Sequence, residues 1–145
     1  MNQNDVNRLI EFHGHLGPYV LMGLRMGMRA MADLALQKHF GVEVTVNCAD
    51  RPPQSCIIDG LQIATGATYG KRNIRLIPAG EVSVTVLNTK TGECIQMRPA
   101  HRAKEAIRTM PAGRGLAEAV AAQMLDWSDE DLFTVEVTRG GAGES

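Results

Sequence analysis

Short segments of alternating apolar and polar residues lie between helical segments, and this arrangement limits the folds that the chain can adopt. Residues 42–47, Val-Glu-Val-Thr-Val-Asn, alternate strictly, as expected for a strand with one buried face. Residues 81–88 and 93–97 are separated only by Thr-Lys-Thr-Gly, which predicts an antiparallel hairpin. A chain that mixes hairpins with helices belongs to the α+β class, with a mixed or antiparallel sheet and helices packed on it.

Two further strands are predicted, over residues 74–77 and 132–138. Residues 78–80, Pro-Ala-Gly, are expected to turn the first of these strands into residues 81–88, so that the two strands are neighbours.

Helical periodicity, capping residues and breakers predict the remaining elements. Asn4 is expected to cap a first helix that runs to His13, and Pro18 is expected to start a long second helix that extends to about Phe40 and ends at Gly41. Further helices are predicted over residues 56–67, 100–109 and 115–126, with one capped turn over residues 128–131.

Two glycines within the second helix predict a close helix contact. Gly23 and Gly27 are four residues apart and therefore lie on one face of the helix. Because glycine destabilises a helix interior by up to about 1 kcal/mol relative to alanine, we expect another backbone to approach that face.

The length of the chain, 145 residues, predicts one domain over residues 1–138, followed by a disordered Gly-rich tail over residues 139–145. Aromatic residues make up only 4% of the chain and there are eight methionines. The core is therefore expected to consist of aliphatic and thioether side chains, which fill irregular gaps.

The charge distribution excludes an extended nucleic-acid surface. The formal net charge is −1, and the one basic cluster, Lys71, Arg72 and Arg75, is too short to follow a phosphate backbone. No run of about 18 apolar residues is present, so no membrane span is predicted.

The sequence also predicts a reducing location. The N-terminal residues 1–8 lack the apolar segment of a signal peptide, which makes the cytoplasm the expected location. Cys48, Cys56 and Cys94 form no Cys-x-x-Cys pair, so we expect them to be free thiols or metal ligands.

The tripeptide His13-Gly14-His15 is the first candidate site. On a helix, side chains two residues apart point about 200° away from one another, so the imidazoles can converge only if Gly14 bends the chain. Converged imidazoles would suit a metal ion. The competing interpretation is a helix C-terminus at which a histidine pairs with exposed carbonyl groups.

Cys56 and Asp59 form the second candidate site. Cys56 is placed at a helix N-terminus, where the pKa of a thiol tends to fall, and Asp59 follows one turn later on the same face. The pair could ligate a metal or form a reactive thiol with an acidic neighbour. The competing interpretation is a buried cysteine beside an aspartate that complements the helix dipole.

These motifs resemble those of FmdE, a family associated with formylmethanofuran dehydrogenase. The opening motif is Phe-His-Gly-His-Leu-Gly-Pro at residues 12–18, followed by Gly-Leu-Arg at 23–25. The second motif is Cys-Ile-Ile-Asp-Gly-Leu-Gln at residues 56–62, with Thr-Gly-Ala-Thr-Tyr-Gly-Lys-Arg-Asn at 65–73. Residues 88–92, Asn-Thr-Lys-Thr-Gly, are similar to a later hairpin of the family.

The resemblance implies an α+β core that pairs into an intertwined homodimer. It also implies a metal site formed by His13, His15 and Cys56, beside a cavity at or near the dimer interface. The family takes its name from genes that accompany a molybdenum enzyme of methanogenesis. Some members carry a C-terminal zinc finger, but no cysteine follows Cys94 here, so that module is not expected.

Three positions depart from the family pattern. Gly17 and Ala67 stand where the family usually has cysteines, and Tyr19 stands where it usually has glycine. The loss of two thiols argues against dithiol redox chemistry.

Three remaining ligands with an open position are typical of a catalytic or substrate-binding metal, and mixed nitrogen and sulfur ligands favour zinc or nickel. The candidates for a fourth ligand or for a neighbouring pocket are Asp59, Tyr19, Gln62, Lys71 and Asn73.

Three functional hypotheses follow. The first is a metal-binding accessory protein of a molybdenum or tungsten enzyme, with tightly bound metal and no turnover. The second is a metal-dependent enzyme, or a binder, of a small anionic substrate that Lys71, Arg72 or Asn73 holds. The third is a dimeric interaction protein whose ancestral site has decayed, as Gly17 and Ala67 would suggest.

Overall fold

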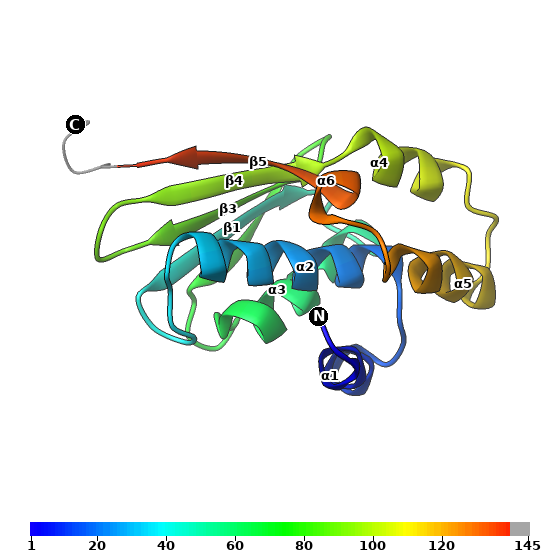
Figure 1. Ribbon diagram of the computed structural model, residues 1–145, viewed down its shortest axis with the longest axis horizontal. Coiled ribbons are helices and arrows are strands. Elements are labelled where there is room, and N and C mark those ends of the chain that lie inside the picture. The colour runs from blue at the N-terminus through cyan, green and yellow to red at the C-terminus, as the bar shows by residue number, and fades with distance from the viewer. Residues whose placement is uncertain (140–145) are drawn as a thin grey trace.

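The computed structural model describes residues 1–139 of the chain, which form a five-stranded sheet with helices on one face (Figure 1). The strands are β1 (Val42–Cys48), β2 (Ile74–Pro78), β3 (Ser83–Asn88), β4 (Cys94–Pro99) and β5 (Phe133–Thr138). The helices are α1 (Gln3–His13), α2 (Pro18–Asp33), the 3₁₀ turn η1 (Gln54–Cys56), α3 (Ile57–Thr65), α4 (His101–Arg108), α5 (Arg114–Met124) and α6 (Asp129–Leu132). The α+β class predicted from the sequence is confirmed.

The sheet is mixed, with the strand order β2-β1-β3-β4-β5. β1, β3, β4 and β5 pair antiparallel, and the predicted β3–β4 hairpin is confirmed. The prediction that residues 78–80 join two neighbouring strands is wrong, because β2 pairs in parallel with β1. Helix α3 lies between these two strands in the chain, and parallel strands require such a crossover.

The two faces of the sheet differ in polarity. One row of paired residues, Val46, Val84, Met97 and Val135, faces the helices, and the first three of these side chains are fully buried. The neighbouring row on the opposite face is polar throughout and consists of Arg75, Thr45, Thr85, Gln96 and Glu136. The helix layer therefore covers a single apolar face.

Helices α2 and α3 pack against one another at backbone distance, as the spacing of Gly23 and Gly27 predicted. A Cβ atom at Gly23 would collide with the carbonyl oxygen of Ile57, and one at Gly60 would collide with the backbone of α2 at Val20. This close contact holds the start of α3 against the start of α2, where both candidate motifs lie.

Helix α2 is shorter than predicted, because it ends at Asp33 instead of near Phe40. Ala35 has a φ of 49°, which leaves the right-handed helical region, and Asn88 donates a side-chain hydrogen bond to the carbonyl of Leu34. The segment between α2 and β1 therefore follows an irregular path over the C-terminal end of α3.

The other predicted boundaries shift by a few residues. The N-cap of α1 is Asn2, not Asn4, and it forms a reciprocal capping box with Asp5. The helix predicted over 56–67 begins as the 3₁₀ turn η1 and ends at Thr65, where Gly66 adopts a left-handed conformation with a φ of 75°.

The C-terminal helices are attached to α2 by charged side chains. Arg25 on α2 donates to the carbonyl of Trp127 at 2.9 Å and to Asp129 at 2.8 Å.

Arg139, predicted to lie in a disordered tail, forms an ion pair with Glu93 on the β4 side of the hairpin. The rest of that predicted tail, residues 140–145, lies outside the described residues.

The core consists of aliphatic and thioether side chains, as the composition predicted. Met22, Met26, Met97 and Met124 are each fully buried, together with leucine, isoleucine and valine. Among the helices of residues 1–139, none combines the length and the apolar character needed to cross a membrane.

Candidate metal-binding site

The bend that Gly14 was expected to introduce is present. Gly14 caps the C-terminus of α1 with a φ of 99°, a left-handed conformation that glycine adopts without steric cost. His13 is the last residue of the helix and His15 lies beyond it, so the two imidazoles escape the opposed directions that a continuous helix would impose.

His13 is paired with Asp59 across the contact between α1 and α3. Its Nδ1 atom lies 2.6 Å from Oδ2 of Asp59, and the His13 side chain is only 11% exposed. Because an ionised carboxylate only accepts hydrogen bonds, Nδ1 of His13 carries the proton and donates it. In a neutral imidazole this leaves Nε2 with its lone pair available.

His15 also carries its proton on Nδ1, as His13 does. Its Nδ1 atom lies 3.2 Å from the carbonyl oxygen of Leu16, which is also an acceptor, so Nε2 again keeps the lone pair. The ring centroids of His13 and His15 are 5.0 Å apart, and their planes are inclined by 41°. The His15 ring lies directly over Gly17, where a Cβ atom would approach its Cε1 atom to 3.2 Å.

The separation of the two imidazole rings can be compared with that of two imidazoles bound to one metal ion. With zinc–nitrogen bonds of about 2.0–2.1 Å and tetrahedral geometry, two bound imidazole rings have centroids roughly 5 Å apart. The observed separation is 5.0 Å. Within residues 1–139, however, no three His, Cys, Asp or Glu side chains are arranged as a group that could hold a metal ion. The structure thus brings together a His pair with a supporting carboxylate, but not a third ligand.

Cys56 ends η1 and directly precedes α3, so it shares the start of this helix with Asp59. The expectation that the helix N-terminus lowers the pKa of its thiol is wrong. Burial raises the pKa of Cys56 and the Asp59 carboxylate raises it further, while a backbone hydrogen bond opposes them. The thiol form is therefore favoured in the structure at neutral pH.

Tyr19 lines a cavity of about 320 Å³ together with Gln54 of η1 and residues of β4 and α4. Burial raises the pKa of the Tyr19 phenol, a hydrogen bond with Gln54 lowers it, and Cys48 raises it. Cys48 itself is fully buried, and its thiol donates to the carbonyl of Ala49 at 3.2 Å. None of the proposed histidine ligands lines this cavity.

The other candidate pocket residues support the loop after α3. Lys71 donates to the carbonyl of Gly66 at 2.6 Å, and the oxygen of Gln62 accepts from the backbone of Tyr69. Asn73 accepts from the backbone of Thr68 and donates to the carbonyls of His39 and Val42. These three side chains already have hydrogen-bonding partners within the chain.

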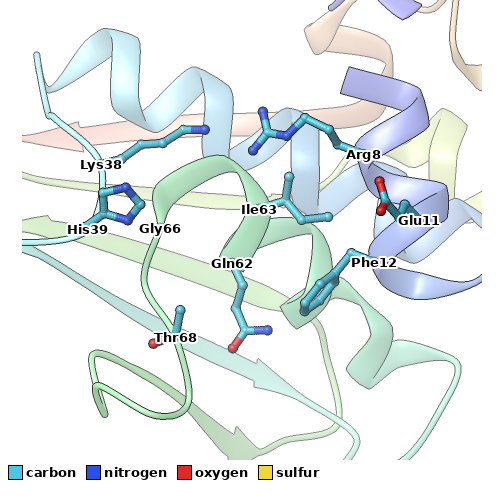
Figure 2. A pocket seen from close by; sticks show the side chains of 9 residues that line it. All are labelled: Arg8, Glu11, Phe12, Lys38, His39, Gln62, Ile63, Gly66 and Thr68. Carbon is cyan, nitrogen blue, oxygen red and sulfur yellow. The ribbon is translucent and has the colours of Figure 1, made fainter. Parts of the chain in front are cut away.

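A larger cavity of about 580 Å³ was not found by sequence reasoning. Figure 2 shows its lining, which comes from α1, from the segment between α2 and β1, and from the C-terminal half of α3 with the loop that follows it. Its cations, Arg8 and Lys38, are 30 residues apart in the sequence and belong to no motif, so no pattern in the chain predicted that they would meet.

The family model that matches the chain covers residues 12–134 and is described as FmdE, molybdenum formylmethanofuran dehydrogenase operon. This chain belongs to the FmdE family. The match includes the His13–His15 segment and the Cys56–Asp59 segment, so the resemblance of the two motifs is confirmed. The first turns of α1, including Arg8, precede the matched residues.

Two relatives of this FmdE-family protein are informative. A probable S-adenosyl-L-methionine-binding protein of Archaeoglobus fulgidus is 32% identical over 98 residues, which are 61% of this chain and only 25% of that protein. The crystal structure of an FmdE-like protein of the tungsten formylmethanofuran dehydrogenase type, from Syntrophus aciditrophicus, superimposes with a TM-score of 0.60, at 20% identity, over 92% of this chain and 70% of the other. The second comparison establishes a shared fold.

Proposed function

We propose that this FmdE-family protein binds a divalent transition metal, zinc or nickel, through His13 and His15, with Cys56 as the third ligand. We further propose that it serves as an accessory protein of a molybdenum or tungsten enzyme of the formylmethanofuran dehydrogenase type. The observation that carries the metal proposal is the 2.6 Å contact between His13 Nδ1 and Asp59 Oδ2.

This contact gives Asp59 a supporting role beside the metal. Metal-binding histidines usually donate their second ring N–H to a carboxylate or carbonyl, which fixes the tautomer and raises the basicity of the coordinating nitrogen. Asp59 does this for His13, and the Leu16 carbonyl does it for His15. Both Nε2 atoms are thereby prepared as ligands.

Cys56 requires the metal for its own deprotonation. Burial and Asp59 raise the pKa of its thiol and hold it neutral in the structure, whereas coordination by a divalent cation deprotonates a thiol outright. The third ligand is therefore recruited when the ion binds, and binding should release a proton. A bound ion would supply Lewis-acid chemistry at this site.

Elemental analysis of protein purified without an affinity tag tests the proposal. We expect about one zinc or nickel ion per chain in the wild type and loss of that ion in His15→Ala and Cys56→Ala. His101→Ala and Cys94→Ala are matched controls, since His101 is exposed on α4 and Cys94 lies on β4. Both controls should retain the metal.

Circular dichroism and thermal unfolding of each variant would show that the fold is intact. Metal-free wild-type protein, even after incubation with zinc and with nickel followed by desalting, would overturn the proposal. Unchanged metal content in His15→Ala would remove His15 from the ligand set.

A further inference from the structure

The 580 Å³ cavity is lined by two cationic side chains, Arg8 and Lys38. Apolar side chains line it as well. Figure 2 shows the Arg8 guanidinium and the Lys38 ammonium pointing toward one another from α1 and from the segment after α2. Ile63 of α3 lies beside Arg8, and Phe12 lines the cavity farther along α1. Phe12 is 57% exposed, so its ring is accessible to a molecule in the cavity.

The two cations lack counterions. Within residues 1–139 neither Arg8 nor Lys38 takes part in an ion pair. Glu11, one turn from Arg8 on α1, also lines the cavity but is not within ion-pair distance of either cation. Like charges that converge without an intervening anion raise the local positive potential, and such a potential concentrates anions.

The nearby helix terminus does not account for these cations. The C-terminus of α3 presents carbonyl groups, which attract positive charge. Lys71 already occupies this end, because its Nζ atom donates to the Gly66 carbonyl at 2.6 Å, and among residues 1–139 neither Arg8 nor Lys38 donates a side-chain hydrogen bond to it. Arg8 and Lys38 are therefore available to an external group.

The wall beside Lys38 is held in a fixed position. His39 has a φ of 86°, an uncommon conformation for a residue other than glycine. Its backbone N–H donates to Thr65 at 3.0 Å, its carbonyl accepts from Asn73, and its ring packs on Gly66, where a Cβ atom would collide with it. These contacts maintain the cavity without a ligand, as is usual for small-molecule sites.

On both helices, residues of the cavity wall are close in sequence to the His13–Asp59 pair. On α1, Phe12 directly precedes His13. On α3, Gln62 and Ile63 follow Asp59 by three and four residues, so they lie on the same face of the helix one turn later. A molecule held by the cations could therefore extend along the α1–α3 groove.

We propose that this cavity binds a small organic anion. Arg8 and Lys38 hold its carboxylate or phosphate group, and Phe12 and Ile63 contact its aromatic or aliphatic body. Glu11 disfavours a second anionic group at the α1 wall. The site is separate from the metal proposal, since the cavity lining includes none of His13, His15 and Cys56. It places the anion at Arg8 and Lys38 instead of at Lys71 and Asn73.

Amide chemical-shift titrations of the full chain test this site with phenyl phosphate, phenylacetate, inorganic phosphate and phenol. We expect saturable shifts at residues 38–39 and 62–68 with a Kd on the order of 1 mM or tighter for phenyl phosphate or phenylacetate. Whichever of these two binds more tightly identifies the anionic group. Inorganic phosphate should bind more weakly, and phenol should not saturate.

The double variant Arg8→Gln/Lys38→Gln should weaken binding of the phenyl anions more than tenfold. Arg75→Gln/Lys90→Gln removes the same charge from exposed positions on β2 and in the hairpin turn and should leave the Kd unchanged. Phe12→Ser should weaken the phenyl anions but not inorganic phosphate.

Equal loss of binding in both double variants would overturn the site, because it would show a general charge effect. Absence of saturable shifts with every probe in the wild type would also overturn it. His15→Ala should still bind the phenyl anions, so failure of the metal proposal and failure of the anion site give different results.

Discussion

Oδ2 of Asp59 lies 2.6 Å from Nδ1 of His13 and joins the end of α1 to the first turn of α3 across 46 residues of sequence. This contact connects the two motifs that the sequence places far apart. It also assigns different roles to the candidate ligands, since Asp59 orients His13 and both histidines retain Nε2 for an ion.

Asp59→Asn should weaken zinc binding by about 10–100-fold, the usual effect of losing a supporting carboxylate. The amide oxygen can still accept from Nδ1, but the negative charge that raises the basicity of the imidazole is gone. Competition with a chromophoric chelator measures the affinity. Asp126→Asn, at an exposed position after α5, is the matched control and should bind zinc as the wild type does. Wild-type affinity in Asp59→Asn would contradict the supporting role.

Gly23→Ala should destabilise the fold by at least about 1–3 kcal/mol, the range for overpacked cores. The added methyl group would meet the backbone carbonyl of Ile57, which cannot rotate away as a side chain can. Gly115→Ala is the control, because a Cβ atom there has open space and α5 gains helix propensity, so it should stabilise by about 0.5–1 kcal/mol. Urea unfolding of both variants measures the difference.

Stability should fall above the ordinary thiol pKa of about 8.5 because of Cys48. Burial, and secondarily the Asp50 carboxylate, raise the pKa of the Cys48 thiol in the folded state. The unfolded chain then loses this proton first, so the stabilisation is fully present below the ordinary value and is lost as the pH rises toward the folded-state pKa. The slope contributed by this thiol is at most about 1.4 kcal/mol per pH unit.

Urea unfolding between about pH 7.5 and pH 10 tests this effect. Cys48→Ala should be less stable at neutral pH, because it leaves a small cavity, but should show a shallower alkaline decline. Cys94→Ala, which removes a thiol from β4, should retain the wild-type slope. Parallel declines in wild type and Cys48→Ala would show that another group is responsible.

Local signals in the sequence predicted local features of the fold. The hairpin of β3 and β4 depends on a short turn that can be recognised in the sequence. The contact of α2 with α3 depends on Gly23 and Gly27, and two glycines in a helix are recognisable because glycine is unfavourable there. The position of β2 depends on a parallel pairing with β1 after a helical crossover. Because β2 and β3 are adjacent in the sequence, they were wrongly predicted to be neighbours in the sheet. The early end of α2 has no breaker in the sequence.

The candidate site was predictable to a similar extent. The motifs identified His13, His15, Cys56 and Asp59, but they could not show that Asp59 pairs with His13. The pKa of Cys56 was misjudged because burial outweighs the position at a helix N-terminus. The cations of the large cavity come together only through the tertiary fold.

Arg25→Met should destabilise the protein by about 1–3 kcal/mol, the range for hydrogen bonds to charged groups. The variant keeps the length of the side chain but removes its bonds to the Trp127 carbonyl and to Asp129, and Arg25 is only 13% exposed. Arg108→Met breaks an exposed ion pair with Glu105 on α4 and should have no measurable effect. Equal unfolding midpoints for wild type and Arg25→Met would show that packing alone attaches α6 to α2.

The homodimer implied by the family resemblance leads to the last prediction. Phe40 and Tyr69 are 76% and 68% exposed and lie near the segment that crosses α3, where Phe40 is within 5.7 Å of Lys71. Aromatic side chains are enriched at protein–protein interfaces relative to the rest of the surface. Light scattering at micromolar concentration should therefore give about twice the chain mass of 15.7 kDa. Phe40→Ser should raise the dissociation constant, whereas Leu116→Ser, which changes an exposed apolar residue on α5, should not. A monomer mass for the wild type would contradict the dimer.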